Sequence, residues 1–418
     1  MTIGIHESKN VELVAYHPAD GKPPFKFAMQ QSGSRWYLYC AHLWHFGWSV
    51  FDVTDPYHPE MLNWIDGPAN TWTIQVQAAD GKLITGLEKI AGSHEARAKD
   101  WGYDASQPWD EGILVWDLSK PVEPRLLGRF RTGGVGTHRN FYAGGPYVHL
   151  AANMASCKGH IYVVVDISEP ARPREVSRWW WPGQNIELGE SQPTHAALHG
   201  PAYVTGAPGS ERAWLPYGRE GAVLLDVSDI TAPRFVSRFS IGDFGSVLGV
   251  HSYLPLPERK LALMSTEAIF EEGRDSANFI VFLDMADETK PRALSFFPVP
   301  EPSAESPYRS YYEKGGKFGP HNMHMPHHQP CYAKLEGLLP VTYFNAGLRL
   351  YDIRDPLYPK EVGYFVPADP PERLGSPAIP SKLVTQYEEV LMDSRGFMYV
   401  SDKNYGLTIL RYTGQPLR

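Results

Sequence analysis

The sequence predicts an all-β protein: a single seven-bladed β-propeller that spans residues 1–418 as one domain. Two observations lead to this prediction, a phrase that recurs along the chain and a composition rich in turn-forming and aromatic residues. The 418 residues include 38 Gly, 37 Pro, 12 Trp and 23 Tyr. Such a mixture favours many short strands joined by turns over long helices.

The recurring phrase consists of a β-rich run, an aspartate, a short turn, a proline and a second strand. Two of its six copies read IYVVVDISEPARPREVSRW and LRLYDIRDPLYPKEVGYFV. The aspartate side chain can cap the turn, and proline fixes the backbone before the second strand begins. The aspartates lie 49 to 68 residues apart, about one four-stranded blade each; they are Asp52, Asp117, Asp166, Asp226, Asp284 and Asp352.

A seventh copy is divided between the two ends of the chain. Gly406 to Leu410 (GLTIL) matches the start of the phrase, but Arg411 stands where the aspartate would be. The missing outer strand corresponds to residues 11–19 (VELVAYHPA), which read like KEVGYFVPA at residues 360–368. We therefore expect the N-terminal strand 11–19 to pair into the C-terminal blade and close the ring.

Charge, hydropathy and cysteine content narrow the class of protein. The net charge is -8, which lacks the basic balance expected of a nucleic-acid binder. No apolar run is long enough to span a membrane, and the polar N-terminus has no secretory signal. Three widely spaced cysteines without a CxxC pair suggest free thiols in a reducing compartment, so we expect a cytoplasmic protein. The sequence does not indicate the oligomeric state.

The phrases VVVDISEPARP and LYDIRDPLYP resemble the LVIVD-repeat family of β-propellers, and the resemblance extends over nearly the whole chain. It implies the propeller fold but little about activity, because that family is functionally mixed and a fold does not dictate a function.

Histidine occupies the same place in four consecutive repeats. The motifs GTH, PTH, GVH and GPH precede the next repeat aspartate by 28 to 33 residues and contain His138, His195, His251 and His321. Inner strands converge on the propeller axis, so we expect these imidazoles to meet at one mouth of the channel and bind one divalent transition metal. Two alternatives are a repeat histidine that fills the channel without a ligand and a metal-free acid–base or anion site. Gln75, Gln386 or Glu388 could complete a metal shell.

Long loops should surround the histidine mouth and bind a small-molecule substrate. Aromatic and arginine side chains there suit an aromatic, sugar-like or carboxylate-bearing ligand, although the aromatics could equally pack the loops together. The candidate substrate contacts are Trp179, Trp181, Trp214, Tyr217, Arg212 and Tyr311. Glu267 ends a strand near the same mouth, where it could orient an imidazole or act as a catalytic acid or base.

The expected chemistry is that of an Fe(II)-dependent oxygenase acting on a small aromatic or apolar molecule. Four neutral histidines without a carboxylate would leave a redox metal with open positions, and Mn, Cu or Zn are also compatible. The arrangement is similar to that of carotenoid-cleavage oxygenases and of oligogalacturonate lyases, and more weakly to a methanethiol oxidase, by architecture alone. The alternatives are a lyase or isomerase that uses Mn or Zn as a Lewis acid, and a non-enzymatic interaction scaffold.

Overall fold

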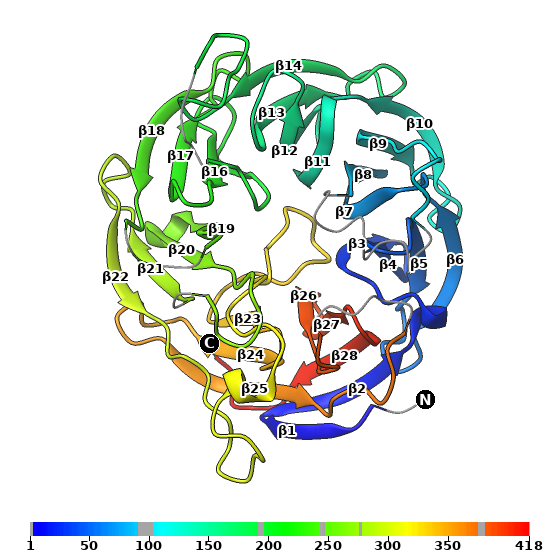
Figure 1. Ribbon diagram of the computed structural model, residues 1–418, viewed down its shortest axis with the longest axis vertical. Helices are drawn as coiled ribbons and strands as arrows, with labels where there is room; N and C mark the ends of the chain where they lie inside the picture. The colour runs from blue at the N-terminus through cyan, green and yellow to red at the C-terminus, as the bar shows by residue number, and fades with distance from the viewer. Residues whose placement is uncertain are drawn as a thin grey trace.

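The computed structural model describes residues 3–90, 103–190, 196–242, 244, 247–275, 278–374 and 381–417. Within these ranges 28 strands form six sheets, which stand side by side in a ring (Figure 1). The helical segments are short: η1 (Ala19–Gly21), η3 (Pro257–Arg259) and α2 (Tyr311–Lys314). None of the described helices has the length and apolar character needed to cross a membrane. The all-β prediction and the propeller architecture are confirmed.

Three of the four-stranded sheets consist of strands consecutive in the chain. The first contains β3 (Lys26–Ser32), β4 (Arg35–His42), β5 (Gly47–Asp52) and β6 (Glu60–Asp66). The second contains β15 (Tyr203–Thr205), β16 (Arg212–Pro216), β17 (Ala222–Asp226) and β18 (Arg234–Phe239). The third contains β19 (Val250–Leu256), β20 (Leu261–Thr266), β21 (Ile280–Asp284) and β22 (Arg292–Phe296).

The N-terminus completes two further sheets. One has the order β1 (Ile5–Lys9), β25 (Lys360–Pro367), β24 (Leu348–Asp352), β23 (Leu338–Thr342). The other has the order β2 (Val11–His17), β28 (Gly406–Tyr412), β27 (Phe397–Asp402), β26 (Tyr387–Met392). In Figure 1 the blue N-terminal strands lie beside the orange and red C-terminal ones. The β1 pairing was not indicated by the sequence.

The remaining strands form one eight-stranded sheet. It contains β7 (Thr71–Ala79), β8 (Lys82–Lys89), β9 (Gly112–Asp117), β10 (Arg125–Phe130), β11 (Gly133–Phe141), β12 (Tyr147–Met154), β13 (Ile161–Asp166) and β14 (Arg174–Trp179). Two runs of four strands join where Gly136 of β11 pairs with Glu88 of β8. Gly136 has φ 112°, and a Cβ atom there would lie 2.2 Å from the carbonyl oxygen of Leu87. Only glycine tolerates this approach.

The prediction of a single seven-bladed propeller is therefore wrong. In the described part of the chain, five four-stranded blades stand beside one eight-stranded sheet, which occupies the place expected for two separate blades. The cause is the pairing at Gly136, which joins β11 to β8, the second strand of the preceding run, and so merges two successive runs into one sheet.

The repeated aspartate shapes the same turn in each copy. Asp166, for example, accepts a hydrogen bond of 2.8 Å from the backbone N–H of Ser168 and another from Arg174. Two residues before it, the pairing of β13 with β14 shifts register between Val164 and Val165. Equivalent shifts occur in the five other copies. Such bulges increase strand twist, which suits the outer strand of a blade.

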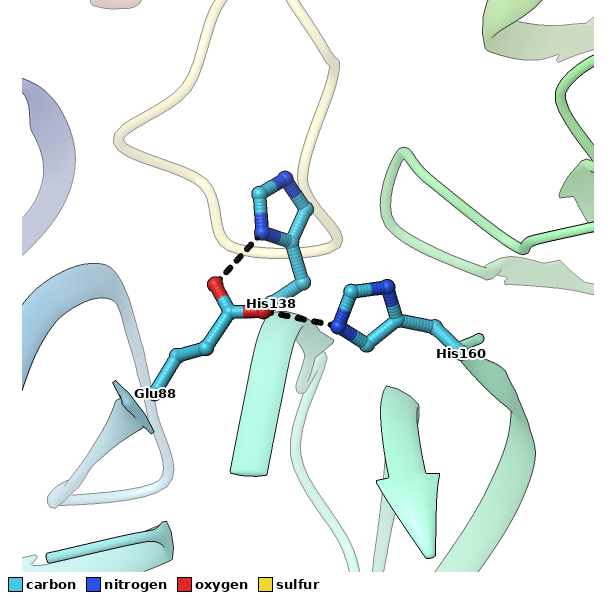
Figure 2. Close-up of side chains that lie close together, drawn as sticks. All are labelled: Glu88, His138 and His160. Carbon is cyan, nitrogen blue, oxygen red and sulfur yellow. Dashed lines mark hydrogen bonds and ion pairs between the residues drawn. The ribbon is translucent and has the colours of Figure 1, made fainter. Parts of the chain in front are cut away.

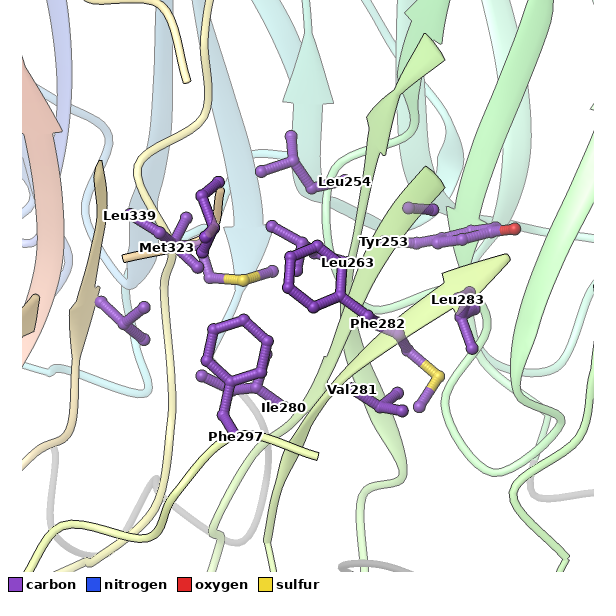
Figure 3. Packing of buried hydrophobic residues seen from close by; sticks show 14 of the residues in the cluster. Tyr253, Leu254, Leu263, Ile280, Val281, Phe282, Leu283, Phe297, Met323 and Leu339 are labelled. Atoms are coloured by element: carbon purple, nitrogen blue, oxygen red, sulfur yellow. The ribbon is translucent and has the colours of Figure 1, made fainter. Parts of the chain in front are cut away.

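Apolar side chains fill the space between neighbouring sheets. Figure 3 shows Phe282 of β21 and Leu263 of β20 packed with Phe297, next to Met323 and Leu339 of the following sheet. Leu263, Phe282 and Leu339 are fully buried. Burial of these side chains fixes each sheet against the next and so positions the inner strands.

The segment before β23 enters the centre of the ring (Figure 1, gold). Its residue Tyr332 accepts a hydrogen bond from the Met29 N–H of β3, and the His327 imidazole lies 2.5 Å from the carbonyl oxygen of Tyr142. His324 is fully buried, donates from Nε2 to the Ala333 carbonyl and accepts at Nδ1 from the Met392 N–H. The segment therefore ties several blades together across the axis.

The buried His324 predicts an acid-sensitive fold. Burial lowers its pKa to about 4, so the neutral form stabilises the protein above the unfolded-state pKa of about 6.5, and this contribution is lost as the pH falls towards 4. Between pH 7 and pH 5 the free energy of unfolding should fall by about 2 kcal/mol through this residue. Urea unfolding measures this free energy at each pH, and it should depend less on pH in His324→Gln than in wild type. The exposed His328→Gln is the control, and equal pH dependence in all three proteins would refute the assignment.

Candidate functional site

Three imidazoles converge on one carboxylate at the channel. Glu267 follows β20, and its Oε2 lies 3.3 Å from His199 Nε2 and 3.6 Å from His251 Nε2. Its other oxygen lies 3.7 Å from His321 Nε2. The Glu267 and His321 side chains are 7% and 2% exposed, and that of His251 is fully buried. We call His199, His251, Glu267 and His321 the Glu267 cluster.

Each histidine of the Glu267 cluster comes from a different sheet. His251 lies on β19, the inner strand of its blade. His199 precedes β15, and its backbone N–H donates to the Pro216 carbonyl at 3.0 Å. His321 precedes β23, and its backbone N–H donates to the Thr342 carbonyl at 2.9 Å. Neighbouring sheets thus hold their imidazoles by backbone pairing, which gives the cluster a rigid frame.

The spacing of the cluster fits a metal ion. Ligands bound at about 2.1 Å in a tetrahedral site are about 3.4 Å from one another, close to the 3.3 to 3.7 Å found around Glu267. The ligand atoms of His199, His251 and Glu267 all lie within 4.8 Å of one another. Within the described part of the chain, His251 Nε2 and Glu267 Oε2 are buried atoms without a hydrogen bond. Such atoms are costly unless something binds them.

The far nitrogens of these rings are held by other groups. His321 Nδ1 lies 3.0 Å from Glu388 Oε2, and His251 Nδ1 lies 2.9 Å from the Ser252 hydroxyl. Contacts of this kind fix the orientation of a ligating imidazole and direct the opposite nitrogen to the metal.

A second group adjoins the first around Glu88 of β8. Figure 2 shows its carboxylate between two imidazoles: His138 of β11 donates from Nδ1 at 2.7 Å, and His160, just before β13, lies 2.7 Å away through Nε2. These three residues also meet the spacing of a metal group, but 2.7 Å is the length of a charge-assisted hydrogen bond. The His138 ring lies 4.4 Å from the His199 ring, and its Nε2 is buried without a hydrogen bond among the described residues. Glu88 therefore orients His138 towards the Glu267 cluster.

The electrostatics of the site favour metal binding. Burial lowers the pKa of His138 and of His251 well below the usual value, which keeps both rings neutral. Burial alone would raise the pKa of Glu267, but electrostatic interactions with the His321 imidazole and with Lys317 hold it well below its usual range. Neutral imidazole and ionised carboxylate are the forms that bind metal ions.

Glu388 is expected to act through His321. Its Oε2 lies 3.0 Å from His321 Nδ1. Replacing Glu388 by Gln keeps the shape but weakens the acceptor, so metal affinity should fall by about 10- to 100-fold, as for other groups that orient a ligand. Competition with a chromogenic chelator measures this change. The exposed Glu169→Gln should keep the wild-type affinity; wild-type affinity in Glu388→Gln would contradict the orienting role.

The structure brings together most of the predicted metal ligands. His251 and His321 lie in the Glu267 cluster, and His138 lies beside it. His195 lies outside the described residues, and His199 provides the third imidazole of the cluster. His199 precedes Asp226 by 27 residues, an offset close to that of the other motifs, so the spacing could have indicated it.

The structure also places the three residues expected as further members of the metal shell, and two residues that the sequence did not indicate. Glu388 contacts His321, while the amide of Gln386 bonds to the backbone of Lys317 and Thr385. Gln75 lies in the inner strand β7 and bonds to the Asn140 carbonyl. Glu88 and His160 were missed because they lie at different offsets, on a second strand and before a third one.

The six predicted substrate contacts lie at packing positions between blades. The Trp179 ring lies 5.5 Å from the Tyr217 ring, and the backbone N–H of Trp181 donates a hydrogen bond to the Tyr217 hydroxyl. Trp214 packs edge-on against Tyr253, and Arg212 pairs with Glu288. The Tyr311 hydroxyl accepts a hydrogen bond from Arg349. A role in substrate binding stays a prediction for these residues.

The comparisons with known proteins support the fold. The family model described as LVIVD repeat matches residues 158–179, which include β13 and β14. The chain contains an LVIVD repeat. No curated protein matches the sequence, and the resemblance to carotenoid-cleavage oxygenases receives no support.

Three solved structures have a similar fold. A Lactobacillus plantarum protein has 12% identity and a TM-score of 0.52, with 82% of this chain and 88% of that chain covered. The periplasmic gluconolactonase PpgL of Pseudomonas aeruginosa has 12% identity and a TM-score of 0.50, with 82% and 86% covered. The N-terminal domain of Nup159 has 9% identity and a TM-score of 0.52, with 98% and 97% covered. At such identities the likeness concerns the fold alone.

Proposed function

We propose that the protein is a metal-dependent enzyme that binds a divalent transition metal in the Glu267 cluster and uses it as a Lewis acid on a small molecule. The observation that carries this proposal is the set of converging ligand atoms around Glu267, two of which are buried without a hydrogen bond among the described residues. Three imidazoles and one carboxylate form a donor set suited to Zn, Mn or Fe.

The surrounding residues would divide the work of such a site. His199, His251, Glu267 and His321 would hold the ion, with Glu388 orienting His321. A bound ion would polarise an oxygen of the substrate or activate a water molecule. His138, whose Nδ1–H is held by Glu88, presents an unprotonated Nε2 beside the cluster. That nitrogen has the form of a general base.

An Fe(II)-dependent oxygenase is the second candidate. The histidine motifs of the sequence favour such an oxygenase through four histidines without a carboxylate, but Glu267 adds a carboxylate to the cluster. Two histidines and one glutamate are the ligands of several catalytic zinc ions, so a carboxylate in the set is compatible with a Lewis acid. Two histidines and one carboxylate are nevertheless also the donor set of non-haem Fe(II) oxygenases, and His199, His251 and Glu267 provide it.

Elemental analysis of untagged protein tests the proposal. About one equivalent of a transition metal is expected in wild type and in the exposed-site control His328→Ala, and much less in His251→Ala. Protein reloaded with Zn, Mn or Fe(II) would then be incubated with a panel of small carboxylates, esters and lactones, with and without oxygen. Turnover with Zn or Mn under argon supports the Lewis acid, and turnover only with Fe(II) and oxygen supports the oxygenase. Protein that takes up no metal would contradict both and favour an interaction scaffold.

A further inference from the structure

Lys317 places an almost buried ammonium group at the edge of the Glu267 cluster. Its Nζ lies 3.5 Å from Glu267 Oε1, and its side chain is only 16% exposed. That distance exceeds the 2.7 to 2.9 Å of a charge-assisted hydrogen bond. In the part of the chain that the structure describes, the Nζ atom makes no hydrogen bond, while the Lys317 backbone N–H is held at 3.1 Å by Gln386. Its three ammonium protons are thus available to a ligand.

A second lysine lies over the same aromatic ring. Lys403 Nζ lies 2.6 Å from Glu388 Oε1 and 5.9 Å from the centre of the Phe344 ring, and its side chain is 11% exposed. Lys317 Nζ lies 5.1 Å from that ring centre, and His321 stacks on the same ring at 4.7 Å. Phe344 therefore supports two cations next to one of the candidate metal ligands.

Among the described residues, acidic and permanently basic side chains around the cluster are equal in number. The carboxylates are Glu88, Glu267, Glu388 and Glu389, and the cations that face them are Lys26, Arg139, Lys317 and Lys403. A divalent ion would add two positive charges to a group of largely buried side chains. An uncompensated charge in such a place is costly, so the loaded site needs an anion.

We infer that the small molecule bound at this site carries an anionic group, a carboxylate or a phosphate, which binds between the metal and the Lys317 ammonium. The inference rests on the proposed metal site and gives its substrate class. The anion offsets the charge of the ion and accepts hydrogen bonds from the Lys317 ammonium. Lys403, tightly paired with Glu388, contributes by its charge.

Calorimetric titration of the metal-loaded protein tests this inference. The probes are malonate, its neutral analogue malonamide and inorganic phosphate, so that carboxylate and phosphate recognition are distinguished. Malonate or phosphate should bind at least about 10-fold more tightly than malonamide, as expected for hydrogen bonds to a charged group. Removing the metal should abolish that preference.

Variants locate the effect at Lys317. Lys317→Met should weaken anion binding by about 10- to 100-fold while retaining the metal, and Lys317→Arg should restore most of it. The exposed Lys120→Met should behave as wild type. Equal binding of malonate and malonamide, or unchanged anion affinity in folded Lys317→Met, would overturn the inference while leaving the metal site intact. Absence of metal from wild type would overturn both proposals.

Discussion

Replacing Glu267 by Gln is expected to remove most of the bound metal. Its carboxylate lies within 3.3 to 3.7 Å of three imidazoles and is the anionic member of the cluster. Mutation of a group that only orients a ligand lowers metal affinity by about 10- to 100-fold. Loss of Glu267, a ligand itself, should therefore lower metal affinity by more than about 100-fold. Elemental analysis after dialysis against a weak chelator measures the change.

The control for this variant is a glutamate outside the cluster. Glu258 is exposed in η3, and Glu258→Gln should retain about one equivalent of metal. Thermal unfolding of both variants without metal shows whether the fold is intact. A folded Glu267→Gln protein that keeps its full metal content would show that the metal binds elsewhere.

Deleting residues 1–17 is expected to have the largest effect on stability. The deletion removes β1 and β2 and leaves β25 and β28 as unpaired edges of two blades. It also uncovers apolar residues of the core below β2, where Leu13 faces Leu410. Exposed strand edges promote aggregation, so the midpoint of thermal unfolding should fall by more than about 10 °C or the protein should become insoluble.

Complementation distinguishes loss of pairing from general damage. A synthetic peptide of residues 3–18 added to the truncated protein should restore much of the lost stability, because it can pair with β25 and β28 again. Removal of residues 416–418, which follow β28, should change the midpoint little. A truncated protein as stable as wild type would contradict the closing role of the N-terminal strands.

The sequence predicted the strands better than it predicted the sheets. Each repeat aspartate marks the end of a strand because an Asx turn is a local feature, as the bond from Ser168 to Asp166 shows. The fusion of two runs of strands depends on the approach of β11 to β8 at Gly136, which is a contact between distant segments. Local patterns do not record such a contact, although the run GGVG at residues 133–136 provides the glycine that it needs.

The site was predicted in part for the same reason. His138, His251 and His321 lie 28 to 33 residues before the next repeat aspartate, and this similar offset places them near one another. Glu88 meets His138 and His160 only because two runs of strands lie side by side. The positions of Glu88 and His160 in the repeat are not equivalent, so no periodic pattern could identify them.

The most direct test of the metal site is a crystal structure of the metal-loaded protein with data collected on both sides of the absorption edge of that metal. We predict one anomalous peak about 2.0 to 2.2 Å from His199, His251 and Glu267, with His321 completing the shell. No peak at the Glu267 cluster, or a peak held by residues outside it, would contradict the account.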